Sequence, residues 1–240
     1  MTDRRGGVSS PPWDSMNVGD HVGDAIDHVQ INRQRLQSAV GAPMVFLKQV
    51  HGQRVVLLDA SSSHGTEADA CIALGPQAAC TIMVADCLPV LMCDTRGQWV
   101  AAAHAGWRGL VGEAGGGVLE SLRRSAPVAQ TRVEDILVWL GPCIGPQAFE
   151  VGTEVREVFC QQDAAATDHF KPSKSGKWLA DLAGLARQRL RQMGIEQIYG
   201  NDSQAQWCTA TNSVRFFSHR RDGATLGQSG RMAACIWLAF

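Results

Sequence analysis

Hydrophobic positions recur at helical spacing in four segments of this chain. In residues 25–41 the apolar side chains Ile26, Val29, Leu36 and Val40 lie three, four or seven positions apart, and Gly41 then provides a typical stop signal. The same spacing predicts helices over residues 149–163 and 178–194. Residues 110–126 are predicted to form another helix despite their glycines, which we expect to permit close packing.

Short apolar runs between these segments predict β-strands. The runs at 44–50 and 54–60 are joined only by His-Gly-Gln, so we expect them to form a hairpin. The other predicted strands are 67–74, 80–86, 89–95, 98–106, 135–142, 196–202, 214–220 and 233–240. Strands come in runs and do not alternate strictly with helices. The pattern therefore predicts an α+β fold with mixed sheets flanked by helices, and not a doubly wound sheet.

The whole chain, residues 1–240, is predicted to be a single domain. No internal repeat or low-complexity linker divides it, and its length suits one large domain. Residues 4–24 are rich in Gly, Pro, Ser and Asp and are expected to form an ordered loop. Hydrophobic residues make up 45% of the chain, which is enough for a substantial core.

Charge and hydropathy exclude several classes of function. Lys and Arg number 22 and Asp and Glu number 23, so the net charge is −1. A near-neutral chain lacks the basic surface of a nucleic-acid-binding or polybasic membrane-binding protein. No run has the length of a membrane span, and the N-terminus does not resemble a signal peptide. We therefore expect a cytoplasmic protein.

One of the eight cysteines differs from the rest. No pair has the C-x-x-C spacing of zinc ribbons or thioredoxin-like sites. Most of the cysteines are interpreted as small buried hydrophobic residues, since they lie in apolar stretches: Cys71, Cys80, Cys93, Cys160 and Cys235. Cys87 instead follows an aspartate just beyond a predicted strand.

Two histidines lie in the same kind of position as Cys87. His51 precedes Gly52 directly and His104 lies two residues before Gly106, each at the predicted end of a strand, so the three side chains could converge at one mouth of a sheet. Two imidazoles and a thiolate suit zinc, and three protein ligands leave a fourth position for water or substrate. The spacing alone leaves open a buried cysteine with two hydrogen-bonded histidines.

Five segments, in order along the chain, resemble the YfiH family. They are KQVHG at 48–52, ADCLPVLM at 85–92, AAAHAGWRG at 101–109, GPCIGPQAFEVG at 141–152 and FFSHRRDG at 216–223. This family is also described as peptidoglycan editing factors, as laccase-domain polyphenol oxidases and as purine nucleoside phosphorylases. The resemblance implies a YfiH-like fold and metal ligation by His51, Cys87 and His104.

This chain departs from the family pattern at two points. Family members usually begin with an extra segment of about one strand, whereas this chain starts almost at the Thr-x-Arg-x-Gly-Gly-Val-Ser motif. The family usually has Tyr after Phe-Phe-Ser or Phe-Tyr-Ser, where this chain has His219. Any role of that tyrosine in shaping the pocket would therefore differ here.

The resemblance also implies phosphorolysis of adenosine, and of inosine and methylthioadenosine. Adenosine deamination is the implied side activity, with Zn²⁺ as the cofactor and Cu²⁺ as the alternative. The implied partners are a purine nucleoside and phosphate.

Phosphate needs an anion site, and the forked guanidinium of arginine suits one. Arg108 is favoured because it lies four residues after His104, and the other candidates are Arg4, Arg220 and Arg221.

Deamination would also need a proton carrier. Asp86, beside Cys87, is the candidate for general acid or base catalysis. The alternative interpretation is that Asp86 forms a hydrogen bond to a ligand or to backbone. The deaminase signature H-x-E with P-C-x-x-C is missing from the chain.

Three other functions stay open at this point. Seven histidines and no His-x-His pair argue against a multicopper oxidase, although a single copper centre that oxidises phenols remains conceivable. A cysteine hydrolase would use Cys87 as nucleophile and His104 as base, for example to edit peptidoglycan precursors. In a non-enzymatic binding module, residues 141–152 would be a packing turn and residues 216–223 a solvated face.

Overall fold

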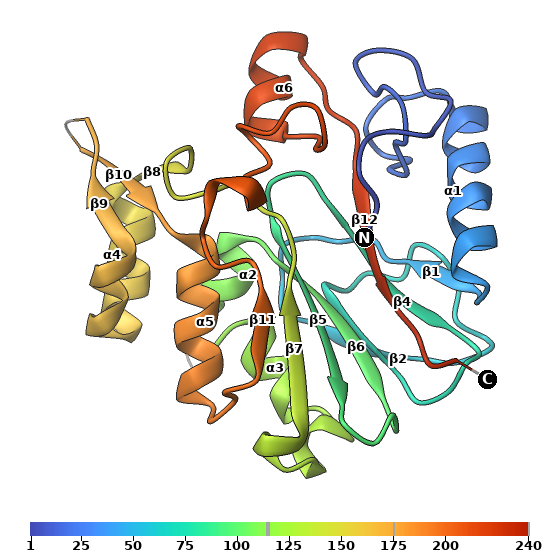
Figure 1. Cartoon of the computed structure of the whole chain (residues 1–240). Helices are drawn as coiled ribbons and strands as arrows, with labels where there is room; N and C mark the ends of the chain where they lie inside the picture. The colour runs from blue at the N-terminus through green and yellow to red at the C-terminus, as the bar shows by residue number, and fades with distance from the viewer. Residues whose placement is uncertain (114–115, 175, 240) are drawn as a thin grey trace.

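The largest element of the fold is a mixed six-stranded sheet. The computed structural model describes residues 1–113, 116–174 and 176–239 (Figure 1). Within these residues the strand order of this sheet is β11-β7-β5-β6-β3-β2, with antiparallel pairs at its centre and a parallel pair at each edge. Its strands are β2 (Val55–Leu58), β3 (Ala70–Ala73), β5 (Leu88–Asp94), β6 (Val100–Ala105), β7 (Ile136–Leu140) and β11 (Ile198–Gly200).

A three-stranded sheet packs against one face of the six-stranded sheet. Its order is β1-β4-β12, and its strands are β1 (Met44–Phe46), β4 (Ala79–Val84) and β12 (Met232–Ile236). Cys80 and Ile82 of β4 share a buried cluster with Cys71 of β3 and Ala102 of β6. The core between the two sheets is therefore built from short apolar strands, as their near-continuous hydrophobic runs indicate.

Helices cover the outer faces of the two sheets (Figure 1). Helix α1 (Ile26–Val40) packs on the small sheet, where Leu36 shares a buried cluster with Met44 and Met83. The large sheet shares its other buried cluster with α2 (Trp107–Val111), α3 (Val118–Arg124) and α5 (Leu182–Gln192). No helix in the described part of the chain has the length and hydropathy needed to cross a membrane.

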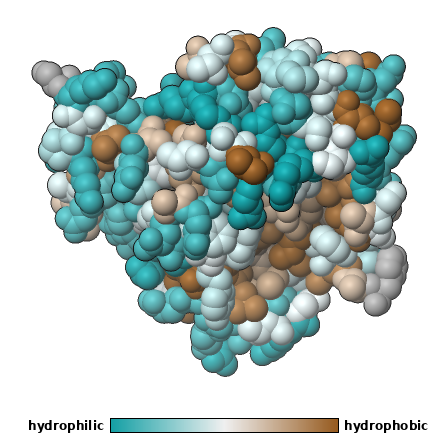
Figure 2. Space-filling view, turned by 45° about the horizontal axis from the view of Figure 1, so that its top comes forward, coloured by the Kyte–Doolittle hydropathy of each residue, from teal (hydrophilic) through white to brown (hydrophobic). Residues whose placement is uncertain are grey.

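A third sheet lies to one side with α4 (Thr153–Gln162) (Figure 1). Its order is β8-β10-β9, and its strands are β8 (Glu150–Gly152), β9 (Phe170–Pro172) and β10 (Lys177–Ala180). The remaining helices are α6 (His219–Leu226) and the short 3₁₀ segments Val128–Gln130, Val133–Asp135, Ala164–His169 and Ala205–Trp207. Figure 2 shows mostly polar side chains on the face turned forward, with a hollow lined by hydrophobic side chains to the lower right of its centre. This mixed arrangement confirms the predicted fold class.

The predicted hairpin between 44–50 and 54–60 is wrong. β1 pairs in parallel with β4 of the small sheet, whereas β2 pairs in parallel with β3 of the large sheet. The connection crosses between the layers because the backbone N–H groups of residues 50–52 donate to the carboxylate of Asp69. His51 has a φ of 60° in this connection. A distant carboxylate, and not pairing of the flanking strands, determines its path.

The predicted helix over 110–126 is divided in two. Helix α2 ends at Val111 and α3 begins at Val118, and residues 114–115 lie outside the described residues. A Cβ at Gly117 would lie 2.0 Å from the Leu110 carbonyl oxygen, so this glycine does permit close packing, as expected.

Three other boundaries differ from the predictions. The segments 149–163 and 178–194 begin with the short strands β8 and β10 before their helices start. The strand predicted over 214–220 is wrong, because α6 begins there. Ser218 caps this helix by accepting from the Arg221 N–H at 3.2 Å, and Asp222 accepts from the Ser218 N–H at 3.1 Å.

The predicted ordered loop at the N-terminus is present. Asn32 of α1 is fully buried, and its amide nitrogen donates to the carbonyl oxygens of Ser15 and Asn17 at 3.0 and 2.8 Å. Its amide oxygen accepts from the Val8 N–H at 2.9 Å. One helical side chain thus ties the irregular segment to the body of the protein.

Candidate active site

The structure brings His51, Cys87 and His104 together at the ends of three different segments. One potential ligand atom from each lies within 4.8 Å of those of the other two. His104 is in β6, Cys87 directly precedes β5, and these two strands are paired. His51 reaches them from the connection between the sheets, and its ring lies edge-on to that of His104, with 4.8 Å between the ring centroids. Fold topology therefore assembles a donor set that is widely separated in sequence.

Asp69 holds two of these residues in place, and the sequence reasoning missed it. Its carboxylate lies 2.8 Å from His104 Nδ1 and accepts from the N–H groups of Val50, His51 and Gly52 at 2.7–3.1 Å. Because His104 Nδ1 is engaged by the carboxylate, Nε2 is left to face the cluster. The sequence signal was an acidic residue inside the apolar run EADACIAL.

The cluster strongly perturbs two acid–base equilibria. Burial by itself would raise the pKa of the Cys87 thiol, but His104 and His51 outweigh burial and lower this pKa to about 6. Burial would lower the pKa of His104, but the Cys87 thiolate and Asp69 raise it to about 9. Without a metal ion, a thiolate and an imidazolium therefore face each other between about pH 6 and about pH 9.

Metal binding to the cluster would release protons from its side chains in a pH-dependent way. Near neutral pH Cys87 is already a thiolate, so His104 is expected to release about one proton per chain when a metal ion displaces it. The release should rise below about pH 6, where Cys87 is also protonated, and fall above about pH 9, where His104 has lost its proton. Calorimetric titration in buffers of different ionisation enthalpy measures this number. A release that does not change with pH would contradict the assignment.

Gly106 leaves room for two residues of the cluster. A Cβ at this position would lie 2.9 Å from Cys87 Sγ and 2.9 Å from His51 Cδ2. The backbone of Gly106 has a φ of −66°, which any residue can adopt, so substitution acts through sterics. Gly106→Ala is therefore expected to weaken metal binding by about 10- to 100-fold without removing a ligand.

A matched control for Gly106→Ala is available beside another residue of the cluster. At Gly52, next to His51, the nearest atom to an added Cβ is Asp69 Oδ2 at 3.4 Å. Gly52→Ala is expected to retain most of the metal affinity. Competition with a chromogenic chelator measures both variants, and equal affinities would contradict the steric interpretation.

The cluster opens onto a cavity of about 360 Å³. The cavity walls come from the six-stranded sheet, the β1-β4-β12 sheet, the N-terminal loop, α2 and α6. A second hollow of about 380 Å³ shares His51, Trp107 and Arg108 with it. Beyond the three cluster residues, the polar and aromatic groups that line the first cavity are His21, Gln49, Asp86, Trp107, Arg108, Phe149, His219, Arg220 and Arg231.

Two of the predicted arginines line this cavity. The Arg108 guanidinium lies over the Trp107 ring, 4.4 Å from its centroid. Arg220 donates from Nη1 to the Glu150 carbonyl oxygen at 2.9 Å and lies 5.6 Å from the Phe149 ring centroid. Both arginines are exposed to solvent, and so is His219, which stands where the family has Tyr.

The structure does not bring Arg4 or Arg221 to the cavity. Arg4 forms an ion pair with Asp14 at 3.1 Å and donates to the Ser213 carbonyl oxygen at 3.1 Å. Arg221 pairs with Asp222 at 2.7 Å and also donates to three carbonyl oxygens around α6, those of Thr209, Ala210 and Phe216. Both guanidinium groups are thus committed to holding loops together.

Asp86 joins three loops at the cavity wall. Its Oδ1 accepts from Thr209 Oγ1 at 2.6 Å, and its Oδ2 accepts from the Arg220 N–H at 2.7 Å. Its carbonyl oxygen accepts from the Ile144 N–H at 2.8 Å, and its φ is 90°. Both carboxylate oxygens are therefore occupied by donors from the protein, which favours the hydrogen-bonding interpretation of Asp86 over a role in proton transfer.

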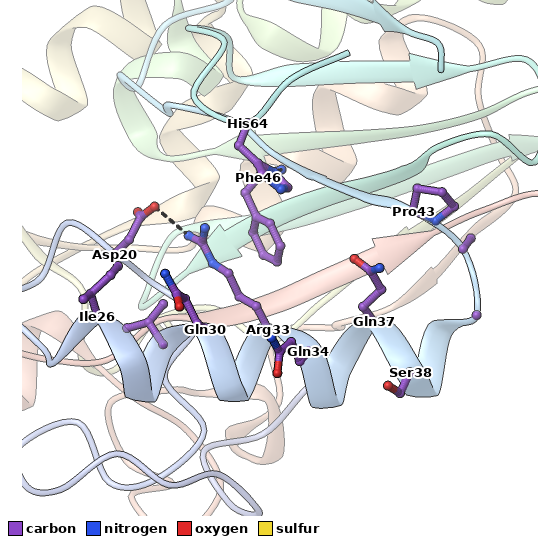
Figure 3. Close-up of a pocket in the computed structure, with 13 residues that line it drawn as sticks. Asp20, Ile26, Gln30, Arg33, Gln34, Gln37, Ser38, Pro43, Phe46 and His64 are labelled. Carbon is purple, nitrogen blue, oxygen red and sulfur yellow. Dashed lines mark hydrogen bonds and ion pairs between the residues drawn. The ribbon is translucent and has the colours of Figure 1, made fainter. Parts of the chain in front are cut away.

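A larger cavity lies elsewhere. It has a volume of about 780 Å³, lies between α1 and β1, and shares no lining residue with the cavity at the cluster (Figure 3). Its one arginine, Arg33, forms an ion pair with Asp20 at 3.0 Å and stacks over Phe46 at 4.1 Å. Size alone therefore does not identify the chemically equipped site.

Comparison with known proteins gives a consistent family assignment. The family described as "Multi-copper polyphenol oxidoreductase laccase" matches residues 1–239. "Purine nucleoside phosphorylase YfiH" of Escherichia coli is 50% identical over 237 residues, covering 98% of this chain and 91% of that protein. A purine nucleoside phosphorylase of Pseudomonas aeruginosa is 45% identical over 239 residues, covering 99% and 92%.

Solved structures agree with the sequence matches. A Neisseria meningitidis protein, 41% identical, has a TM-score of 0.89 and covers 100% of this chain and 93% of its own. The YfiH protein of Bacillus licheniformis, 28% identical, also has a TM-score of 0.89 and covers 99% and 91%. From its sequence motifs, its fold and these relatives, the chain belongs to the laccase-domain family that includes YfiH.

Proposed function

We propose that this protein is a zinc-dependent purine nucleoside phosphorylase that cleaves adenosine, and also inosine and methylthioadenosine. Relatives that carry the name purine nucleoside phosphorylase, at 45–50% identity over nearly the whole chain, support an enzyme of this kind. The observation that carries the proposal is the His51–Cys87–His104 cluster on the wall of a cavity that arginines also line.

The donor set fits a zinc ion. Two imidazoles and one thiolate are typical zinc ligands, and their potential donor atoms converge within 4.8 Å. Asp69 fixes the ring of His104, as carboxylates commonly do for zinc-bound histidines. When bound, zinc supplies a Lewis acid and an open coordination position at the cavity wall.

The remaining groups bind and orient the substrates. We assign Arg108 and Arg220 to electrostatic contact with substrate and phosphate oxygens, because both line the cavity. Trp107 is half-buried beside Arg108 and offers aromatic surface to a purine. Asp86 is assigned a positioning role, because its hydrogen bonds join the cavity loops to α6.

Adenosine deamination is proposed as a side activity of the same centre. A zinc ion held by His51, Cys87 and His104 would supply the Lewis acidity that activation of water in this reaction needs. A cytoplasmic location is proposed as well, since all eight cysteines are free thiols and a reducing compartment would keep them so.

One observation favours a second candidate function. The low pKa of Cys87, about 6, and its contact with His104 describe an activated thiolate that could act as a nucleophile in a hydrolase. Metal occupancy separates the two functions, because a thiolate that ligates zinc is not free to attack. A copper polyphenol oxidase is less favoured, because the described residues assemble one group of three His, Cys, Asp or Glu side chains and not several.

Product analysis tests the proposal. The purified protein is incubated with adenosine in the presence and absence of phosphate, and the products are separated by chromatography. We expect adenine and ribose 1-phosphate in equal amounts, with their formation dependent on phosphate, and a smaller amount of inosine that does not need phosphate. Absence of both the base and ribose 1-phosphate for adenosine, inosine and methylthioadenosine would contradict it.

A further inference from the structure

Arg231 is a third arginine on the cavity wall, and the sequence reasoning did not single it out. It lies directly before β12, is half-buried, and lines the same cavity as the cluster. Its Nη1 donates to the carbonyl oxygens of Ser229 and Gly230 at 2.8 and 3.2 Å. In the described part of the chain, its Nε and Nη2 have no hydrogen-bond acceptor. Two donors on one edge of a guanidinium are therefore left for a ligand.

The other two arginines of the cavity differ from Arg231 in exposure and in contacts. Arg108 stacks on Trp107, Arg220 binds the Glu150 carbonyl oxygen, and both are exposed. Of the three arginines, Arg231 is the least exposed to solvent. A charge-assisted fork of two parallel N–H donors matches the oxygens of a phosphate, and it binds more strongly where water is partly excluded.

The N-terminal loop holds the backbone of Arg231 in position and lies against the stem of its side chain. The Arg231 N–H donates to Asn17 Oδ1 at 2.8 Å, and the same oxygen accepts from the Gly19 N–H at 2.9 Å. Asn17 is fully buried. A Cβ at Gly19 would lie 2.7 Å from Arg231 Cγ, so the glycine makes space for the arginine stem. The backbone and stem of Arg231 are thus fixed by a segment more than two hundred residues away in sequence, and its Nη1 is held by the neighbouring carbonyl oxygens of Ser229 and Gly230.

Arg231 lines the same cavity as the cluster, so its guanidinium is subject to the charges of the cavity wall. Burial lowers the pKa of Arg231, whereas the negative charges of Cys87 and Asp86 raise it. Asp86 accepts from Thr209 Oγ1 and from the Arg220 backbone N–H, and in the described part of the chain it forms no hydrogen bond with Arg231. An anion in the cavity would provide the acceptor that Arg231 lacks.

We propose that Arg231 binds the inorganic phosphate co-substrate through Nε and Nη2 and directs it toward a nucleoside beside the cluster. The inference rests on the proposed phosphorolysis. In that reaction a phosphate oxygen forms a bond to C1′ of the ribose while the C1′–N9 bond breaks. The electron pair of the broken bond goes to the purine, which takes up the proton that the hydrogen phosphate loses. Arg108 and Arg220, which are exposed, then contact substrate oxygens at the solvent side of the cavity.

Steady-state kinetics of Arg231→Gln test the proposal. The KM for phosphate should rise at least about tenfold, because a charge-assisted fork is lost, while the KM for the nucleoside changes little. Arg96→Gln is the matched control, since Arg96 is an exposed arginine in the β5–β6 turn and does not line the cavity. An unchanged phosphate KM would overturn the proposal, and so would a rise confined to the nucleoside KM.

A second variant keeps the test valid if Arg231→Gln does not fold. Gly19→Ala leaves the arginine in place but displaces its stem, and it should raise the phosphate KM in the same selective way. If it leaves the phosphate KM unchanged although the stem must shift, the preorganised site is contradicted.

Direct binding separates failure of this inference from failure of the proposed function. If the wild-type protein cleaves no nucleoside, the proposed function fails, and calorimetric titration with inorganic phosphate then tests Arg231 alone. Saturable binding by the wild-type protein that Arg231→Gln abolishes supports the anion site. Equal binding by both proteins overturns it, and so does binding of adenosine 5′-monophosphate without binding of free phosphate.

Discussion

Replacing Cys87 by alanine is expected to abolish metal binding and to reduce phosphorolysis by about a thousandfold. The side chain contributes the one anionic ligand of the cluster, and two imidazoles alone bind zinc much more weakly. Loss of Lewis-acid catalysis removes several kcal/mol of transition-state stabilisation, and each 1.4 kcal/mol is about tenfold in rate. Elemental analysis and phosphate-dependent turnover, measured on the same preparation, check both parts of the prediction.

A second cysteine provides the control for this experiment. Cys160 lies on α4, is a free thiol, and does not line the cavity, so Cys160→Ala should keep both metal and activity. A Cys87→Ala protein that is fully active would contradict the account. If the wild-type protein holds no metal and still loses all activity on this substitution, the cysteine hydrolase is supported instead.

The next largest effect is expected for Asp69→Ala. Asp69 is completely buried and accepts from His104 and from three backbone N–H groups. Its removal leaves a buried imidazolium and these N–H groups without their acceptor, so the free energy of unfolding should fall by about 3–5 kcal/mol. The metal affinity of the folded fraction should fall by about 10- to 100-fold, because His104 loses its orientation.

Denaturant unfolding of the metal-free protein near neutral pH measures this loss of stability. Asp59→Ala is the comparison, since Asp59 is exposed and binds only Ser61 and Ser62 close by in sequence. A surface change of that kind is expected to alter stability by no more than about 0.5 kcal/mol. Equal stability of the two variants would show that Asp69 does not organise the site.

Hydrophobic periodicity predicted most of the fold because most elements bury one continuous apolar face. It located α1, the strands of the six-stranded sheet and of the β1-β4-β12 sheet, and the bodies of α4 and α5. It failed at the connection around His51, because that path depends on Asp69, seventeen to nineteen residues away. It also failed at Ser218, where a helix cap overrides the β-rich pair Phe216 and Phe217.

The candidate site was only partly accessible from the sequence. The strand-end positions of His51, Cys87 and His104 suggested convergence, and the family resemblance selected them as ligands. Asp69 and Arg231 act through contacts with distant segments, which no local pattern records. Arg4 lies in a family motif, but its ion pair with Asp14 commits it to the N-terminal loop.

The most direct test of the central claim is a metal titration of activity. Metal-free protein is titrated with zinc, and phosphate-dependent release of adenine is followed at each step. The account predicts no turnover without zinc and a linear rise that ends at about one zinc ion per chain, as three ligands of one cluster require. Full turnover in the absence of metal would contradict it.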